Sequence, residues 1–93
     1  MATELRDLAL FVAVVTEGSI TAGAQQLDLS LSAASTRLSA LERDHGLTLL
    51  HRGRRGVTPT HAGRVLVEHA RRVMAESAEL ERKLAAHGKG LRY

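Results

Sequence analysis

Three features of the sequence predict a mainly α-helical protein: a winged helix-turn-helix, with three helices and a two-stranded wing, followed by one long helix. Residues 18–38 contain two short helical segments, each opened by a serine and separated by a few residues, which is the pattern of a helix-turn-helix. Two short extended stretches around a glycine-bracketed arginine pair predict a β-hairpin. The last third of the chain carries apolar residues at heptad spacing, which predicts a long helix with a packed seam.

The length and these patterns divide the chain into three parts. The 93 residues suit one small domain with a modest core, so oligomerisation is expected to add stability. We expect the winged helix-turn-helix at residues 1–59, a linker and dimerisation helix at 60–87, and a frayed or truncated tail at 88–93.

The first helix is predicted from an apolar stripe. Apolar residues recur at steps of three and four, namely Leu5, Leu8, Phe11, Val12 and Val15, as expected for one face of a helix. Gly18 is the expected end of this helix. Ser19 then caps a second helix in which Ala22, Ala24 and Leu27 are available for packing. Gly23 is a weak point of that helix, because an internal glycine costs about 1 kcal/mol relative to alanine.

The third helix, at about residues 31–45, has two chemically different faces. Ser30 is its predicted cap and Gly46 its end. One face is aliphatic, with Ala34, Leu38 and Leu41. The remainder is rich in hydroxyls, with Ser32, Ser35, Thr36 and Ser39. Lysine and glutamate would be the common choice on a face that only meets solvent.

The predicted wing is strongly basic. Residues 47–52 and 57–60 are the expected strands, and Arg54 and Arg55 lie at the tip between Gly53 and Gly56. The whole chain has 13 basic and 10 acidic residues, a formal charge of +3. Residues 51–72 alone hold six arginines against Glu68, a local charge of 6 − 1 = +5. Such a patch favours a polyanionic partner, although a solvated surface would have the same composition.

The last helix, capped by Thr60, carries a heptad seam. Two series spaced by seven interleave along it: Leu66, Val73 and Leu80, and Ala70, Ser77 and Leu84. A helix this long cannot bury its distal half against so small a body, so we expect a second copy of the chain to cover the seam and form a homodimer. The alternative is a covering domain outside this sequence.

The composition argues against several other classes of protein. There are no cysteines, which excludes a disulfide framework and thiolate metal sites. The five histidines form no compact ligand pattern, and no nucleophile has a base at recognisable spacing, so we expect no metal, no cofactor and no enzyme activity. The aromatic residues are Phe11 and Tyr93 alone, which argues against stacking on single-stranded bases and favours duplex DNA.

The sequence also bears on where the protein acts. No basic stretch precedes a long apolar run at the amino terminus, so we expect no secretory signal. The longest apolar run, residues 8–15, is far too short to span a bilayer. We therefore expect a cytoplasmic protein that is not associated with a membrane.

Several motifs in fixed order carry a resemblance to a known family. They are Phe11-Val12-Ala13-Val14, Glu17-Gly18-Ser19-Ile20-Thr21, Leu41-Glu42, Gly46-Leu47-Thr48-Leu49-Leu50, Arg52, Arg55 and Pro59-Thr60-His61-Ala62-Gly63. With these residues, positions 5–86 resemble the amino-terminal DNA-binding region of LysR-type transcriptional regulators. The resemblance implies a winged helix-turn-helix, a linker helix that pairs antiparallel with its mate, and a separate effector-sensing domain. That domain is absent here, so we expect a fragment of a longer regulator, in which any small-molecule effector binds elsewhere; a naturally short relative is the alternative.

The resemblance also assigns roles to residues. It implies that Leu31 to Arg37 form the groove-facing start of the reading helix. Family members often carry glutamine at the position of Leu31, proline or serine at that of Ser32, and arginine or lysine at that of Thr36. Leu31 offers apolar contact alone, for instance to a thymine methyl. The expected base readers are therefore Ser32, Ser35, Thr36 and Arg37.

Backbone contacts are expected from the wing and the helix caps. Arg52 and Arg55 match family positions that approach the DNA backbone, and Arg54 adds a cation beside them. For Arg52 an internal salt bridge to Glu42 or Glu68 is the open alternative. The remaining candidates are caps that also approach DNA: Thr21, Ser30 and Thr60.

Together these features predict a sequence-specific transcriptional regulator that binds promoter DNA as a homodimer, with the third helix in the major groove. A winged-helix module used only for protein association is the rival interpretation.

Overall fold

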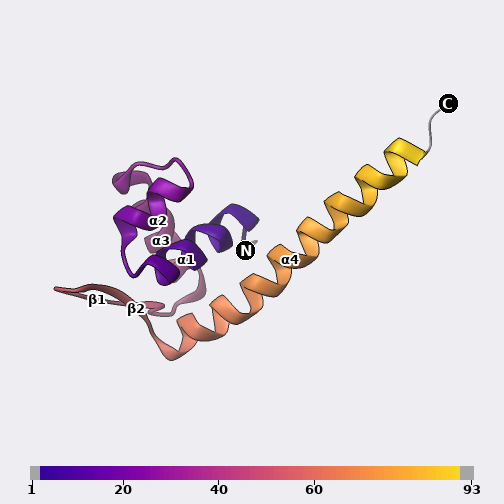
Figure 1. The fold of residues 1–93 in the computed structure, drawn as a ribbon. Coiled ribbons are helices and arrows are strands. Elements are labelled where there is room, and N and C mark those ends of the chain that lie inside the picture. Colours follow the sequence, from indigo (N-terminus) through magenta and orange to yellow (C-terminus); the bar gives the residue numbers. More distant parts are fainter. Residues whose placement is uncertain (1–2, 91–93) are drawn as a thin grey trace.

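Four helices and one two-stranded antiparallel sheet make up residues 3–90, the part of the chain that the computed structural model describes (Figure 1). The elements in order are α1 (Leu5–Glu17), α2 (Ile20–Gln26), α3 (Leu31–His45), β1 (Leu50–Gly53), β2 (Gly56–Pro59) and α4 (His61–Gly90). This arrangement confirms the predicted mainly α-helical winged helix-turn-helix with a long final helix.

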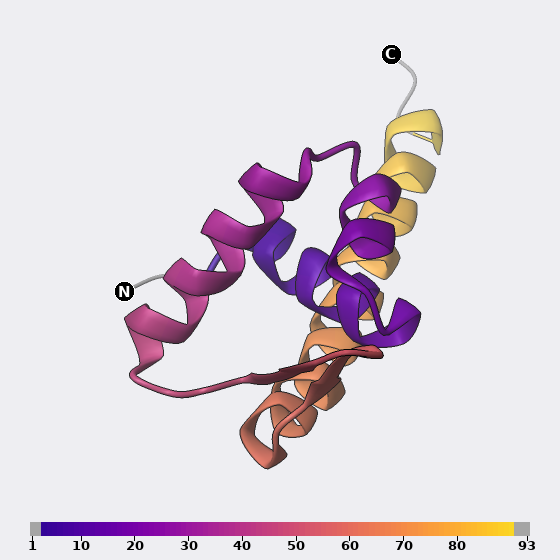
Figure 2. The ribbon, with the colours of Figure 1, turned by 90° about the vertical axis from the view of Figure 1, so that its left-hand side faces the viewer.

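Helix α1 lies at the centre of the fold. Helices α2, α3 and α4 and strand β2 all contact it, and it lies between α3 and α4 (Figure 2). Its buried residues are Leu10, Phe11, Ala13 and Val14, whereas Leu5 is 44% exposed. The predicted stripe was therefore only partly right. A helix surrounded by neighbours buries more than one face, so a single amphipathic stripe does not describe it.

Gly23 has a packing role that its helix propensity does not predict. Its Cα lies so close to α1 that an added Cβ would stand 2.6 Å from the Cγ2 of Val14 and 2.7 Å from its backbone. The glycine predicted to weaken α2 instead allows α1 and α2 to pack in close contact. Ser19 caps α2 as predicted, since its hydroxyl accepts from the amide of Ala22 at 3.1 Å.

This contact makes Gly23→Ala a destabilising substitution, although alanine is the better helix former. We expect the free energy of unfolding to fall by about 1–3 kcal/mol, the usual cost of overpacking a core. Urea denaturation followed by circular dichroism measures the change. Gly88→Ala in α4 is the matched control, because nothing lies within 4 Å of a Cβ there. Equal effects of the two substitutions would contradict the packing role.

Helix α3 and the wing follow the predicted boundaries closely. The hydroxyl of Ser30 accepts from the amide of Ala33 at 3.0 Å, and Gly46 ends α3 in the left-handed conformation, with φ 63°. Strands β1 and β2 pair from Leu50 opposite Pro59 to Gly53 opposite Gly56. The amide of Val57 donates to the carbonyl of Gly18 at 3.0 Å. The wing is thus fastened to the turn between α1 and α2.

Helix α4 begins as predicted but ends later. Thr60 caps it, because the Thr60 hydroxyl accepts from the amide of Gly63 at 3.0 Å. The helix passes through Gly88, which does not adopt a positive φ and so does not end it. The predicted tail at 88–93 is therefore helical up to Gly90, and residues 91–93 lie outside the described part.

The proximal half of α4 belongs to the body of the protein. Ala62, Leu66 and Val67 pack against the core, and Ala70 is 1% exposed. The rest of the helix projects away from the body (Figure 1), and the molecule measures 57 × 24 × 20 Å. The first turns of α4 thus complete the core, and the division of the chain at residue 60 stays a prediction.

Candidate nucleic-acid interface

The outward face of α3 is polar and exposed. It holds Ser32, Thr36, Ser39 and Arg43, which recur at steps of four, three and four and are all exposed. They lie opposite the buried residues Ala34, Leu38 and Leu41. Within residues 3–90 their side chains form no hydrogen bond or ion pair with the protein. Their donors and acceptors therefore face solvent and can serve an outside partner.

The other predicted readers at the start of α3 occupy different surroundings. Leu31 is the first residue of the helix and 51% exposed, so an apolar side chain borders the hydroxyl-rich face. Ser35 is only partly exposed and lies on the flank of this face. The hydroxyl of Ser30 is engaged as the helix cap. The cap role of Ser30 is thus confirmed, and its contact with DNA stays a prediction.

Arg37 does not lie with the other predicted readers. Its Nη1 is 3.1 Å from Oδ1 of Asp7 in the first turn of α1, and both side chains are partly buried. The family resemblance puts Arg37 among the readers because it implies that residues 31–37 form the groove-facing start of the helix. One step along a helix turns a side chain by about 100°, so consecutive residues do not share a face. The grouping of Arg37 with the exposed face is therefore corrected.

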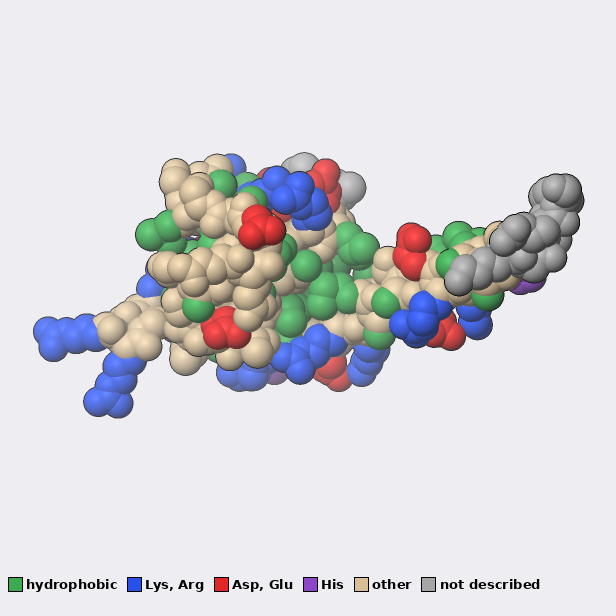
Figure 3. All heavy atoms as spheres, turned by 45° about the horizontal axis from the view of Figure 1, so that its top comes forward, with side chains coloured by type: hydrophobic (Ala, Val, Ile, Leu, Met, Phe, Trp, Pro, Cys, Tyr) green, Lys and Arg blue, Asp and Glu red, His purple; other side chains and the backbone are tan. Residues whose placement is uncertain are grey.

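The wing carries exposed cations beyond those of α3. Arg54 and Arg55 occupy the turn between β1 and β2 and are exposed. Basic side chains project from this end of the molecule (Figure 3). Within the described part of the chain neither guanidinium has an ion pair or a hydrogen bond. Both are therefore available to an anionic partner, as the sequence analysis expected.

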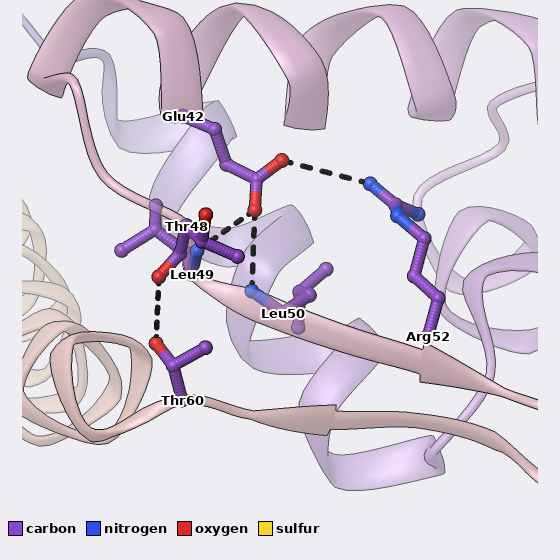
Figure 4. A network of polar contacts seen from close by, with 6 residues as sticks. All are labelled: Glu42, Thr48, Leu49, Leu50, Arg52 and Thr60. Carbon is purple, nitrogen blue, oxygen red and sulfur yellow. Dashed lines mark hydrogen bonds and ion pairs between the residues drawn. The ribbon is translucent and has the colours of Figure 1, made fainter.

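Glu42 joins α3 to the base of the wing (Figure 4). Its Oε2 accepts from the amides of Leu49 at 2.7 Å and Leu50 at 3.2 Å, and its Oε1 lies 3.7 Å from Nη2 of Arg52. Of the two acidic partners considered for Arg52, the structure selects Glu42, since Glu68 pairs with Arg72. Arg52 remains 45% exposed. It can therefore hold Glu42 and still face solvent.

Replacing Glu42 tests this connection. Leu49 and Leu50 are 2% and 3% exposed, so Glu42→Ala leaves their amides without an acceptor. We expect a loss of about 1–3 kcal/mol in the free energy of unfolding. Glu42→Gln keeps an acceptor oxygen and is expected to cost less. Urea denaturation gives both values, with Glu81→Ala on the exposed surface of α4 as the control; a similar loss in that control would refute the specific role.

Two threonines were predicted to be caps that also touch phosphate. Thr60 is the cap of α4, and its hydroxyl also donates to the carbonyl of Thr48 at 2.8 Å (Figure 4). Its polar hydrogen is thus already engaged. Thr21 is not a cap, because it lies inside α2 and Ser19 fills that role. Its side chain is exposed, so its approach to phosphate stays a prediction.

Two residues of the exposed face were not among the predicted readers. Ser39 belongs to the predicted hydroxyl-rich residues but not to the predicted readers, and Arg43 belongs to neither group. Extending the spacing from Ser32 and Thr36 by three and then four residues would have found both.

Other kinds of site receive no support from the described residues. No three His, Asp or Glu side chains within residues 3–90 come together in a way that could hold a metal ion. Over the same range, no helix combines the length and the apolar composition needed to cross a membrane.

Comparison with known proteins identifies the family. Residues 5–64 match the bacterial regulatory helix-turn-helix proteins of the lysR family. The chain belongs to the LysR family. This membership agrees with the predicted resemblance, and the chain spans about 30% of the length of the curated relatives it matches. Family membership gives no support to a module used only for protein association.

Relatives and solved structures agree with this assignment. The chain is 38% identical to the nitrogen assimilation regulatory protein nac of Klebsiella aerogenes over 88 residues, 95% of this chain and 29% of that relative. Its structure is similar to that of the BenM DNA-binding domain in complex with catB site 1 DNA, with a TM-score of 0.91, 31% identity and coverage of 97% and 100%. The CbnR DNA-binding domain in its DNA complex gives a TM-score of 0.84, 34% identity and coverage of 92% and 99%.

Proposed function

We propose that this chain is the DNA-binding part of a transcriptional regulator, which binds duplex promoter DNA with α3 in the major groove and the wing on the phosphate backbone. The observation that carries the proposal is the exposed face of α3, whose polar side chains have no partner within the described protein. A hydroxyl can donate to or accept from base edges, and a methyl group contacts thymine. Ser32 and Thr36 are the leading readers, with Ser35 and Leu31 beside them.

The wing arginines supply contacts of a different kind. Arg54 and Arg55 have no internal partner in the described chain, and guanidinium groups pair well with phosphate. Phosphate contacts set the register of a protein on the duplex, whereas contacts with base edges choose the sequence. Arg43 at the far end of the exposed face, together with Arg52, adds charge beside the groove. The two solved structures named above are complexes with DNA, which supports the same docking for this chain.

The proposed regulator acts as a homodimer through the projecting part of α4. Val73, Leu80 and Leu84 are 44%, 54% and 57% exposed, and Ser77 lies between them on the seam. The seam predicted from sequence also contained Leu66 and Ala70, but these pack within the chain's own fold. The partner helix is therefore expected to cover the distal residues. A promoter-binding dimer without a membrane helix in its described part is expected in the cytoplasm.

Selection from a random duplex pool tests the function directly. The chain is incubated with 30-base-pair random duplexes, and bound DNA is amplified and sequenced over several rounds. A DNA-reading homodimer is expected to enrich a motif with two-fold symmetry, because each copy docks on one half-site. Absence of any enriched motif, with protein that remains folded and dimeric, would contradict sequence reading.

A further inference from the structure

An ion pair connects the reading helix to the central helix. Nη1 of Arg37 lies 3.1 Å from Oδ1 of Asp7, across 30 residues of sequence. The side chains are 33% and 23% exposed, so the pair is partly shielded from solvent. Asp7 belongs to the first turn of α1, where a negative charge is also favourable to the helix dipole. Asp7 is thus a fixed anchor for the guanidinium.

The position of Arg37 on α3 separates it from the surface that faces outward. Five residues at about 100° each put Arg37 about 140° around the helix from Ser32. The side chain extends towards α1, whereas Ser32, Thr36 and Ser39 face solvent. A guanidinium held at that angle does not reach base edges that Ser32 and Thr36 contact.

Another element also orients α3, because Glu42 near its carboxyl end accepts from the amides of Leu49 and Leu50 at the base of the wing. Towards α1 the contact of α3 is otherwise mainly apolar. The buried residues of α3 are Ala34, Leu38 and Leu41, and apolar contact has no preferred direction. A charge-assisted hydrogen bond does have one. A second polar link, from Thr3 Oγ1 to His45 Nε2 at 3.0 Å, joins α3 to the chain before α1 at the carboxyl end of α3. Arg37 supplies the directional link nearer the reading end.

From this we infer that Asp7 and Arg37 are a positioning pair, which sets the rotation of α3 about its own axis so that Ser32 and Thr36 meet the bases at the correct angle. The inference rests on the proposed function and replaces the expectation that Arg37 reads bases. A pair exposed to this degree adds little to overall stability. Its effect appears in the contacts that depend on the orientation of α3, which are those with base edges.

Charge-changing variants separate positioning from electrostatics. Asp7→Asn raises the net charge by one and Arg37→Met lowers it by one, so a purely electrostatic effect on DNA affinity has opposite signs in the two. If the pair positions α3, both variants lose affinity for the selected duplex. We expect the ratio of this affinity to that for an unrelated duplex of equal length to fall about three- to tenfold in each. Fluorescence anisotropy measures both affinities. Asp44→Asn, at an exposed residue of α3, is the control for charge.

Two further measurements complete the test. The swapped variant Asp7→Arg with Arg37→Asp keeps the net charge and is expected to recover most of the preference for the selected duplex. Hydrogen exchange of α3 backbone amides, measured without DNA, is expected to be faster in Asp7→Asn than in the unchanged chain and in Asp44→Asn. All affinities are compared at a temperature where circular dichroism shows each variant folded. If Arg37→Met does not fold, Arg37→Gln replaces it.

Three results would overturn the inference. The first is that Asp7→Asn behaves like Asp44→Asn, and both keep the ratio of affinities for the selected and unrelated duplexes that the unchanged chain has. The second is that Arg37→Met enriches a different motif in the selection while Asp7→Asn enriches the original one, which would make Arg37 a base reader. The third is that hydrogen exchange of the α3 backbone amides is identical in Asp7→Asn and the unchanged chain. Failure of the proposed function is distinct from these, because the unchanged chain would then enrich no motif, while the exchange experiment still reports on the pair.

Discussion

Replacing both wing-tip arginines with glutamine is expected to weaken binding to every duplex by about 10–100-fold near 0.15 M salt, without changing the preferred sequence. Arg54 and Arg55 are exposed and have no partner within the described chain. Their guanidinium groups are therefore available to pair with DNA phosphates. Each phosphate contact displaces counterions, and the proposed dimer loses four arginines in all, so the slope of log affinity against log salt should become less steep by about 4. Anisotropy titrations at four or five salt concentrations give both quantities.

A matched control keeps the loss of charge but moves it away from the wing. Arg72→Gln with Arg82→Gln also removes two positive charges, both from α4, where these residues pair with Glu68 and Glu79. We expect this control to change the affinity and the salt slope much less. Equal behaviour of the two double variants would mean that the wing does not touch DNA and that only net charge matters.

Local chemistry explains which parts of the fold were predictable from sequence. Ser19, Ser30 and Thr60 open helices because a hydroxyl satisfies an amide within three residues. Gly18 and Gly46 end helices because they adopt positive φ. Such interactions involve neighbours in the chain, so the sequence contains all the information needed to recognise them.

The features that were missed depend on contacts between distant residues. From the sequence alone Gly23 is interpreted as a weak point of α2, because nothing in the sequence shows that Val14 of α1 packs against its Cα. Likewise, the apolar stripe of α1 was incomplete because several elements pack around that helix. No pattern within one segment reveals how many neighbours surround it.

The candidate site shows the same limit. The exposed hydroxyl face of α3 follows from helical periodicity, and the wing arginines follow from their position between glycines. The placement of Arg37 does not, because it depends on Asp7, 30 residues away. The heptad seam of α4 is a second case. Leu66 and Ala70 pack in the chain's own core and the distal residues are exposed, and periodicity alone does not predict where this division falls.

The exposed part of that seam gives the second large prediction. Leu80→Glu with Leu84→Glu is expected to convert the proposed dimer to a monomer, raising the dissociation constant by at least about 1000-fold. Both leucines are more than half exposed in the single chain, and burying a leucine contributes about 1.5–3 kcal/mol. Four leucines are changed per dimer, and the new carboxylates oppose burial as well. Sedimentation velocity over a range of concentrations measures the effect.

The same substitutions should also affect helix α4 and DNA binding. A helix of 30 residues is about 45 Å long, and its projecting half has no body to pack on in a monomer. Isolated helical segments of that size are marginal in water, so we expect a loss of helical circular dichroism as the dimer dissociates. Affinity for a two-fold symmetric duplex should fall towards that of a single half-site.

Ala75→Glu with Ala78→Glu provides the matched control for this experiment. It adds the same two charges to the same helix at exposed positions on the side away from the seam. This variant should remain dimeric and retain its affinity for DNA, because its new carboxylates stay in solvent. If Leu80→Glu with Leu84→Glu remains a dimer as well, the copies meet on another surface, and the exposed leucines of α4 are covered by something other than a second α4.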